Sequence, residues 1–390
     1  MAIIKKRNKN RNIKKSRIND KNSGKFDGFL FIVIVMLSMF GLLMISSSGS
    51  VYAMDRFGDL SLFFTKQVKY LLLGFVILLI MQKIDYNKFR KLSLYIFIAS
   101  IVLLIMVLIS NIGISGNGAT RWIKIGGFSF QPTEFVKLSV ILYFSAWCAS
   151  RGEKIKDLKE GLVPFLIMLT IVSIPIAMQP DIGSLSFIVL ISISIFFLAG
   201  ASLKHLFLIG IAGTIIFSIF VFSSEYRMER VNTFLHPELD PNDSGYQIRQ
   251  ASIAIGSGGL YGVGLGHSKQ SKGLFLPEPV GDSIFAIISE EFGFVGSVTL
   301  VFVFLFLIWR IFKIAMLSDD IFARLVVSGI GIWIVGQAYM NIMAITGLMP
   351  LTGIPLSFIS YGGSSLIAMM MAMGIILNIS RHVDEKYNYK

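Results

Sequence analysis

Ten apolar runs constrain this chain of 390 residues more than any other feature of its sequence. A helix needs about 20 consecutive apolar residues to cross the hydrocarbon core of a bilayer. Hydrophobic residues make up 54% of the chain and charged residues 15%, a composition that excludes an ordinary soluble domain. We therefore predict an all-α, polytopic integral membrane protein with about ten transmembrane helices. The expected spans lie near residues 27–49, 66–82, 91–111, 131–149, 162–178, 183–200, 203–222, 282–309, 321–345 and 357–379.

The basic residues between these runs predict the orientation of the chain. The formal net charge is +13, and Lys and Arg recur at every second connection, as at 83–91 and 151–159. Cytoplasmic connections of membrane proteins carry this excess. We expect a basic cytoplasmic tail at 1–26, a ten-helix membrane domain at 27–381 and a cytoplasmic C-terminal tail at 382–390. The basic tail is expected to contact anionic lipid and not nucleic acid.

One connection is far longer than the others. Residues 223–281 form a polar excursion between the seventh and eighth spans, and we expect a large extracytoplasmic loop there. A loop of this length within a compact domain usually carries function. Its glycine-rich part, 256–266, invites comparison with phosphate-binding loops, but it lacks the Gly-Lys-Ser/Thr ending and follows no expected strand. Its two histidines lack the spacing of metal ligands.

Asp282 is the first candidate for a functional site. It stands where the polar loop runs into the eighth apolar run, within the stretch Leu276–Gly293. An ionisable group inside hydrocarbon costs about 2.5–3.5 kcal/mol on insertion scales, so such a group marks a site by default. A carboxylate at the edge of the membrane therefore points to chemistry and not to packing.

The run after Asp282 has small residues at helical spacing. On a regular helix, the residues that share the face of Asp282 are Ala286, Ser289, Gly293 and Gly296. Such a face either packs against a neighbouring helix or forms the floor of a groove for a lipid chain. Because Glu291 projects to the opposite side, Glu290 and Glu291 cannot both join Asp282. We expect one or both of them in buried polar pairs.

Further candidates surround the fourth span. Arg121 stands beside a tryptophan among glycines, and it either binds a phosphate or anchors the chain in the membrane interface. Gln131 and Glu134 open the span, where a glutamate is also ordinary helix-start chemistry. Lys137, one turn further, either neutralises Glu134 or receives an anionic substrate.

Two more outward segments supply candidates. Asp181 either caps the sixth span or faces the same site as Asp282. The ninth span carries polar residues expected to face the bundle interior, namely Gln337, Tyr339 and Asn341. The segment 349–365, which includes Ser360 and Gly362, breaks the helical pattern with prolines and glycines. Irregular backbone at membrane depth is tolerated only where it is buried in protein or lines a cavity, so we expect this segment to form another wall of the site.

Several motifs, taken together, resemble a known family. They are Gln-Pro-Thr-Glu at 131–134, Gly-Leu-Gly-His-Ser-Lys-Gln at 264–270, Leu-Pro-Glu through Glu-Glu at 276–291 and Ile-Ser-Tyr-Gly-Gly-Ser-Ser at 359–365. In this order they resemble the FtsW/RodA/SpoVE (SEDS) family, and the resemblance covers roughly residues 27–381. The 264–270 and 359–365 motifs look more like the division or sporulation branch than the elongation branch.

The resemblance implies a peptidoglycan glycosyltransferase that polymerises lipid II into glycan strands at the outer face of the cytoplasmic membrane. It also implies a class B penicillin-binding protein as transpeptidase partner, within a divisome or a related cell-wall complex. By motif, the family's catalytic aspartate maps to Asp282. Its important arginine, lysine and glutamate map to Arg121, Lys137 and Glu278. Family members commonly carry His-Thr before the aspartate, where this chain has Val-Gly, so a role of that His or Thr does not carry over.

The chemistry of glycan transfer fits these residues. A base must deprotonate the sugar 4-hydroxyl as it attacks the anomeric carbon, and a partly desolvated carboxylate such as Asp282 suits that task in an inverting transfer. The departing lipid diphosphate needs positive charge. Arg121, Lys137 and Arg249 can supply it with or without a divalent cation such as Mg²⁺ or Mn²⁺, so the sequence leaves the need for a metal open.

Two other functions would use the same residues. A flippase would move a lipid-linked precursor without making bonds, but it needs charge along the whole path, and the inward halves of these spans show few ionisable residues. A purely structural division scaffold would leave Asp282 without a task. We therefore predict the polymerase.

Overall fold

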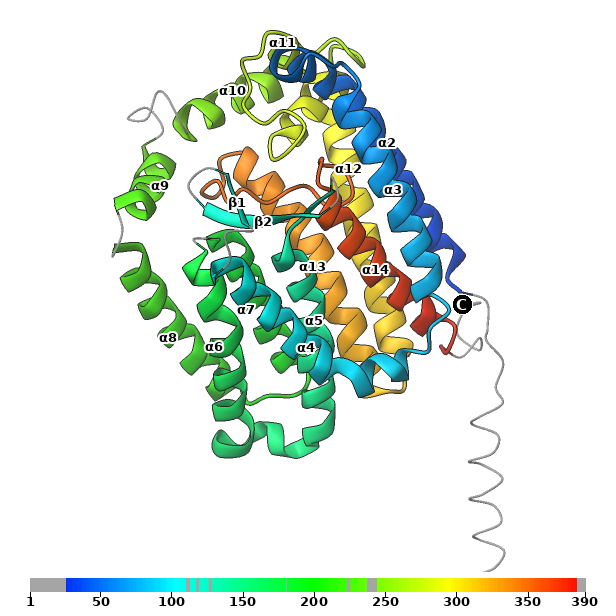
Figure 1. Cartoon of the computed structure of the whole chain (residues 1–390), viewed down its shortest axis with the longest axis vertical. Coiled ribbons are helices and arrows are strands. Elements are labelled where there is room, and N and C mark those ends of the chain that lie inside the picture. The colour runs from blue at the N-terminus through cyan, green and yellow to red at the C-terminus, as the bar shows by residue number, and fades with distance from the viewer. Residues whose placement is uncertain are drawn as a thin grey trace, which may run out of the picture.

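The structure is a computed structural model of the chain. It describes residues 26–109, 113–116, 119–125, 128–179, 181–222, 225–236 and 244–383. The predicted tails lie almost wholly outside this part, as do residues 223–224 and 237–243 of the long loop. The described residues form a bundle of long helices with one small sheet near one end (Figure 1).

Ten helices in the described part of the chain correspond to the ten predicted spans. They are α2 (Gly28–Phe57), α3 (Leu62–Met81), α4 (Tyr86–Ile109), α5 (Pro132–Arg151), α6 (Val163–Met178), α7 (Ile182–Leu198), α8 (Leu203–Phe222), α12 (Ile284–Leu317), α13 (Ile321–Ile345) and α14 (Gly363–Ser380). Among the described residues, seven candidate spans are long and apolar enough to cross a membrane, and α7 and most of α8 form shorter apolar helices. The prediction of an all-α polytopic membrane protein is confirmed.

Short elements occupy one end of the bundle. The long loop supplies α9 (Glu225–Leu235), α10 (Ser244–Ser257) and α11 (Lys269–Lys272). The connection before α5 supplies β1 (Gly113–Gly116), β2 (Ala119–Ile125) and β3 (Phe128–Phe130), which form an antiparallel sheet in the order β1-β2-β3. The sequence did not predict this sheet, because β1 and β3 have only four and three residues and the segment was read as a glycine-containing outward loop.

Helices α5, α13 and α14 form the centre of the bundle. Most of α13 and α14 is buried, whereas α2, α3, α4 and α12 leave apolar side chains exposed, as expected for helices that face lipid. Close approach holds α14 against α3 (Figure 1). A Cβ atom on Gly374 would lie 2.6 Å from the carbonyl oxygen of Leu78, so only glycine allows the two backbones to approach this closely.

Polar contacts join the helices at the opposite end. The backbone N–H of Asp27 donates to Ser380 Oγ at 3.0 Å, and Asp27 Oδ2 lies 2.7 Å from Arg310 Nε. The backbone N–H of Tyr86 donates to Asn378 Oδ1 at 3.0 Å. The start of α2, the start of α4 and the end of α14 therefore meet at one end, which is also the end that carries the basic connections. The alternation of connections that the sequence predicted is present in the fold.

Candidate functional site

Asp282 lies in the turn that leads into α12. The helix begins at Ile284 with Ser283 as its N-cap. The sequence predicted that Asp282 would open this helix, but the residue lies in the turn before it. The side chain is half-buried. A Cβ atom on Gly353 would lie 3.6 Å from Asp282 Oδ2, and Gly353 has a φ of +68°, which favours glycine. The carboxylate therefore faces backbone that carries no side chain.

The irregular segment 346–362, between α13 and α14, holds the backbone just before Asp282. Ser360 Oγ donates to the carbonyl oxygen of Gly281 at 2.8 Å. The backbone N–H of Tyr361 donates to the carbonyl oxygen of Val280, also at 2.8 Å. The segment thus lies beside Asp282, where the sequence placed a wall of the site.

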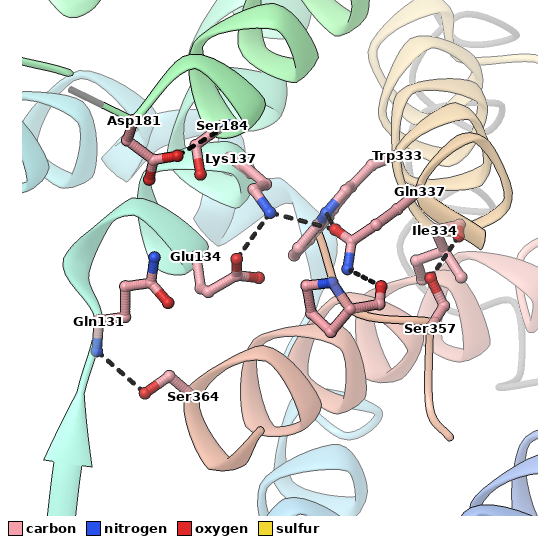
Figure 2. Close-up of polar contacts among 11 residues, drawn as sticks. Gln131, Glu134, Lys137, Asp181, Ser184, Trp333, Ile334, Gln337, Ser357 and Ser364 are labelled. Atoms are coloured by element: carbon pink, nitrogen blue, oxygen red, sulfur yellow. Dashed lines mark hydrogen bonds and ion pairs between the residues drawn. The ribbon is translucent and has the colours of Figure 1, made fainter. Parts of the chain in front are cut away.

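Gln131 and Gly362 lie where α5 and α14 begin. Gly362 is the N-cap residue of α14. In the first turn of that helix, Ser364 Oγ accepts from the backbone N–H of Gln131 at 2.9 Å (Figure 2). The same hydroxyl donates to the carbonyl oxygen of Ser129 at 3.0 Å. Gln131 therefore takes part through its backbone. Ser364 belongs to the 359–365 motif but was not itself predicted as a site residue, because a serine in a first helical turn is too common to single out.

Lys137 and Glu134 form a buried ion pair on α5 (Figure 2). Lys137 Nζ lies 2.7 Å from Glu134 Oε1, with side-chain exposures of 2% and 4%, and it donates to Gln337 Oε1 at 3.1 Å. Trp333 Nε1 donates to the same oxygen at 3.1 Å, and the centre of its ring lies 5.6 Å from Lys137 Nζ. Of the two roles predicted for Lys137, the structure shows the pairing with Glu134.

Asp181 caps α7 next to the irregular segment. Its Oδ1 accepts from the backbone N–H of Ser184 at 3.1 Å (Figure 2). A Cβ atom on Gly183 would lie 2.8 Å from the carbonyl oxygen of Thr352, so the start of α7 packs directly on the segment that faces Asp282. Asp181 Oδ2 and Glu134 Oε2 are both buried without a hydrogen-bond partner among the described residues. Buried acceptors are normally satisfied, so these two oxygens are exceptions within the described part of the bundle.

Three predicted residues lie on the elements that cover this end of the bundle. Glu278 is exposed, has a φ of +47°, and its carbonyl oxygen accepts from the backbone N–H groups of Gly281 and Ser283 at 3.1 and 3.3 Å. Arg249 is exposed on α10. Arg121 is part of β2, but its side chain lies outside the described part of the structure.

Helix α10 reaches the site through a residue that the sequence analysis did not single out. Gln247 Nε2 donates to Ser283 Oγ at 2.9 Å, so the long loop contacts the residue that follows Asp282. Within the described ranges, no group of three or more His, Cys, Asp or Glu side chains is arranged to hold a metal ion.

Glu290 and Glu291 belong to a separate polar cluster. Glu290 Oε2 accepts from Ser268 Oγ at 2.5 Å, and Glu290 Oε1 accepts from the backbone N–H of Lys269 at 2.8 Å. Glu291 Oε1 accepts from Ser47 Oγ at 2.6 Å and from the backbone N–H of Gly266 at 3.0 Å. Both side chains are buried. The expectation that one or both make buried polar pairs is confirmed, and their partners come from the long loop and α2.

The glycine-rich part of the long loop fills a break in α12. Gly293 has φ 66° and ψ −164°, which interrupts the helix. The four replacement hydrogen bonds are Val263 N to Glu290 O at 2.9 Å, Gly264 N to Glu291 O at 3.0 Å, Phe294 N to Gly259 O at 2.8 Å and Val295 N to Leu260 O at 3.1 Å. The glycines therefore serve backbone packing. The predicted continuous face of small residues is wrong beyond Gly293, because the positive φ turns the chain there.

Comparison with known proteins agrees with this architecture. The family model for FtsW, RodA and SpoVE, described as cell cycle protein, matches residues 28–385. Stage V sporulation protein E of Bacillus subtilis is 39% identical over 356 residues, which cover 91% of this chain and 97% of that protein. A probable peptidoglycan glycosyltransferase FtsW of a Geobacter species is 36% identical over 355 residues, covering 91% and 96%.

Solved structures share the fold. One match is a chain of a solved structure described as structural coordination of polymerization and crosslinking by a peptidoglycan synthase complex. Its TM-score is 0.76 at 26% identity, and the match covers 92% of this chain and 98% of that chain. The rod shape determining protein RodA of Thermus thermophilus matches with a TM-score of 0.68 at 24% identity, covering 92% and 97%. The matching family model, the two relatives and the shared fold together show that this chain belongs to the FtsW/RodA/SpoVE family.

Proposed function

We propose that this chain is a peptidoglycan glycosyltransferase that polymerises lipid II, with Asp282 as its general base. The observation that carries the proposal is the place of Asp282, half-buried before α12 and facing the bare backbone at Gly353. A partly buried carboxylate next to the long outer loop suits a general base, which must reach a hydroxyl group of the substrate. Relatives named probable peptidoglycan glycosyltransferase FtsW support the same activity.

In this reaction, Asp282 takes the proton of the acceptor sugar's 4-hydroxyl while the oxygen attacks the anomeric carbon of the donor sugar. A bond forms between that oxygen and the anomeric carbon, and the bond from the carbon to the lipid diphosphate breaks. The diphosphate leaves with the electron pair. Because attack comes from the face opposite the leaving group, the anomeric centre is inverted.

The remaining site residues bind the substrate in this proposal. Arg121 and Arg249, on β2 and α10, supply positive charge to the leaving diphosphate. Lys137 holds one oxygen of Glu134, so the other oxygen is directed to a donor group of the substrate, and Asp181 offers a second free oxygen.

Three further residues line the path to Asp282 in the proposed site. Glu278 covers the approach, since it is exposed on the turn before Asp282. Ser360 and Gly362 shape the wall on the other side, because both belong to the irregular segment that packs on that turn.

We infer that the basic end of the bundle faces the cytoplasm, in keeping with the positive-inside rule. Both tails are then cytoplasmic, and the site lies at the outer face, where α10 contacts it. A class B penicillin-binding protein fits as the transpeptidase partner in a division or sporulation complex. Support comes from the solved relative described with polymerization and crosslinking in one synthase complex.

The test is glycan-strand formation from purified lipid II by the detergent-solubilised chain with its cognate transpeptidase. A micelle has no second leaflet, so a flippase would leave lipid II unchanged, whereas a polymerase makes long glycan products. We expect polymer. Intact lipid II after incubation with the folded complex would instead favour transport or a scaffold.

A further inference from the structure

Asn341, on α13, contacts the backbone of Asp282 directly. It is 2% exposed, and its Nδ2 donates to the carbonyl oxygens of Asp282 and Ile354, both at 2.8 Å. A side-chain amide nitrogen has two N–H donors, so both are used here. One side chain thereby ties the candidate base to the irregular segment that faces it.

The orientation of this amide follows from its neighbours. Both partners of the nitrogen are carbonyl oxygens, so only the nitrogen end of the amide can face them. Oδ1 of Asn341 is buried and has no hydrogen-bond partner in the described part of the chain. An amide kept in the core with one end unsatisfied is unusual, and it points to a task for the end that is bonded.

Gln337, one turn earlier on α13, makes the matching contact. Its Nε2 donates to the carbonyl oxygen of Pro355 at 3.1 Å, while its Oε1 accepts from Lys137 Nζ. Figure 2 shows Gln337 in contact with both Lys137 and Trp333. Two consecutive carbonyl groups of the segment are therefore held by two side chains one helical turn apart.

We propose that Asn341 is a positioning residue that fixes Asp282 at a set distance from the segment it faces. Asp282 lies in the turn before α12, and Asn341 holds its carbonyl group at 2.8 Å. The same amide holds Ile354, next to Gly353, whose backbone faces the carboxylate. Loss of the amide lets the base and this backbone move relative to each other. The inference rests on the proposed role of Asp282 as the base.

Asn341 lies beneath backbone and is proposed to contact no substrate, so its loss should change the chemical step more than binding. A displacement of about 1 Å can lower a rate about 100-fold. We expect kcat to fall about 10- to 100-fold while KM stays within about threefold of wild type.

The experiment measures kcat and KM for glycan formation from lipid II by the chain with its transpeptidase. The variants are Asn341→Leu and Asn341→Asp, which keep the branched shape and remove the donors. Tyr339→Phe is the matched control, since it also removes one hydrogen bond from α13, that of Tyr339 Oη to the carbonyl oxygen of Val301 at 3.0 Å. Melting temperatures identify variants that fold like this control.

A folded Asn341 variant with kcat within about twofold of Tyr339→Phe would overturn the inference. If neither variant folds, Asn341→Ser, which keeps one shorter donor, is measured in the same way, and a wild-type kcat for it would overturn the inference too. Asp282→Asn is run in parallel. If it is inactive while Asn341→Leu is normal, only this inference fails; if it is fully active, the proposed base fails and the inference with it.

Discussion

Lys137 shows how a charged side chain can be buried inside the bundle. A buried cation is stabilised mainly by its partner, and removal of that partner leaves an uncompensated charge. Here Glu134 and Gln337 are the hydrogen-bond partners that the structure shows for the ammonium group among the described residues. The sequence could predict the pair from its i,i+3 spacing. It could not predict Gln337, because that contact joins residues 200 positions apart.

The ion pair gives the first prediction. We expect Glu134→Gln to destabilise the protein by about 3–5 kcal/mol, because it leaves Lys137 charged and buried without its counterion. The double variant Glu134→Gln/Lys137→Met should recover most of this loss. Thermal unfolding of the purified protein measures both.

An exposed ion pair with the same i,i+3 spacing serves as the control. Lys156 Nζ lies 2.6 Å from Glu153 Oε2, also at i,i+3, but both side chains are more than half exposed. Exposed pairs contribute about 0–1 kcal/mol, so Glu153→Gln should change stability little. Equal effects of Glu134→Gln and Glu153→Gln would contradict the account of Lys137.

At the scale of elements, the break in α12 separates the short piece before Gly293 from the rest of the helix. The short piece follows Asp282 directly, and the glycine-rich loop supplies the hydrogen bonds that the break removes. A break at membrane depth requires such replacement. Hydropathy predicted the span but not the break, because the replacing groups come from a loop that precedes the break by about 30 residues in the chain.

Gly262 gives the most direct test of the packing of the glycine-rich loop on the break in α12. A Cβ atom there would lie 2.1 Å from the carbonyl oxygen of Glu291, and φ is +82°. We expect Gly262→Ala to be destabilising through both effects, with overpacking about 1–3 kcal/mol and the left-handed conformation about 1–2 kcal/mol.

Gly259→Ala isolates the second effect. Gly259 also has a positive φ, +54°, but a Cβ atom there meets no described atom within 4 Å. It should therefore cost the conformational strain alone. If thermal unfolding shows the two variants to be equally stable, the loop does not pack on α12 as described.

At the scale of the whole molecule, the sequence predicted the ten spans, their alternation between two ends and the meeting of Asp282 with the irregular segment. These follow from hydropathy and from helix-breaking residues at membrane depth. It did not predict the sheet before α5 or the role of Asn341. Both depend on contacts between distant elements, and an asparagine in a helix shows no sign of the carbonyl groups it will hold.

The orientation of the molecule is a prediction at this scale. Cys148, the one cysteine of the sequence, is buried, so introduced cysteines can be labelled against a low background. We expect a membrane-impermeant maleimide to label Lys272→Cys on intact cells, because exposed Lys272 lies on the outer loop. Lys156→Cys, exposed at the basic end, should react only after permeabilisation. The reverse pattern would contradict the proposed orientation.

The central claim is that Asp282 is the base of a polymerase, and the rate of glycan formation by Asp282→Asn tests it most directly. Asp59→Asn is the control, since Asp59 is an exposed carboxylate at the same end that caps the backbone N–H of Ser61 at 2.8 Å. With lipid II binding checked separately, we expect Asp282→Asn to lose about 10²- to 10⁴-fold in rate and Asp59→Asn to match wild type. Polymerisation by Asp282→Asn at the wild-type rate would contradict the account.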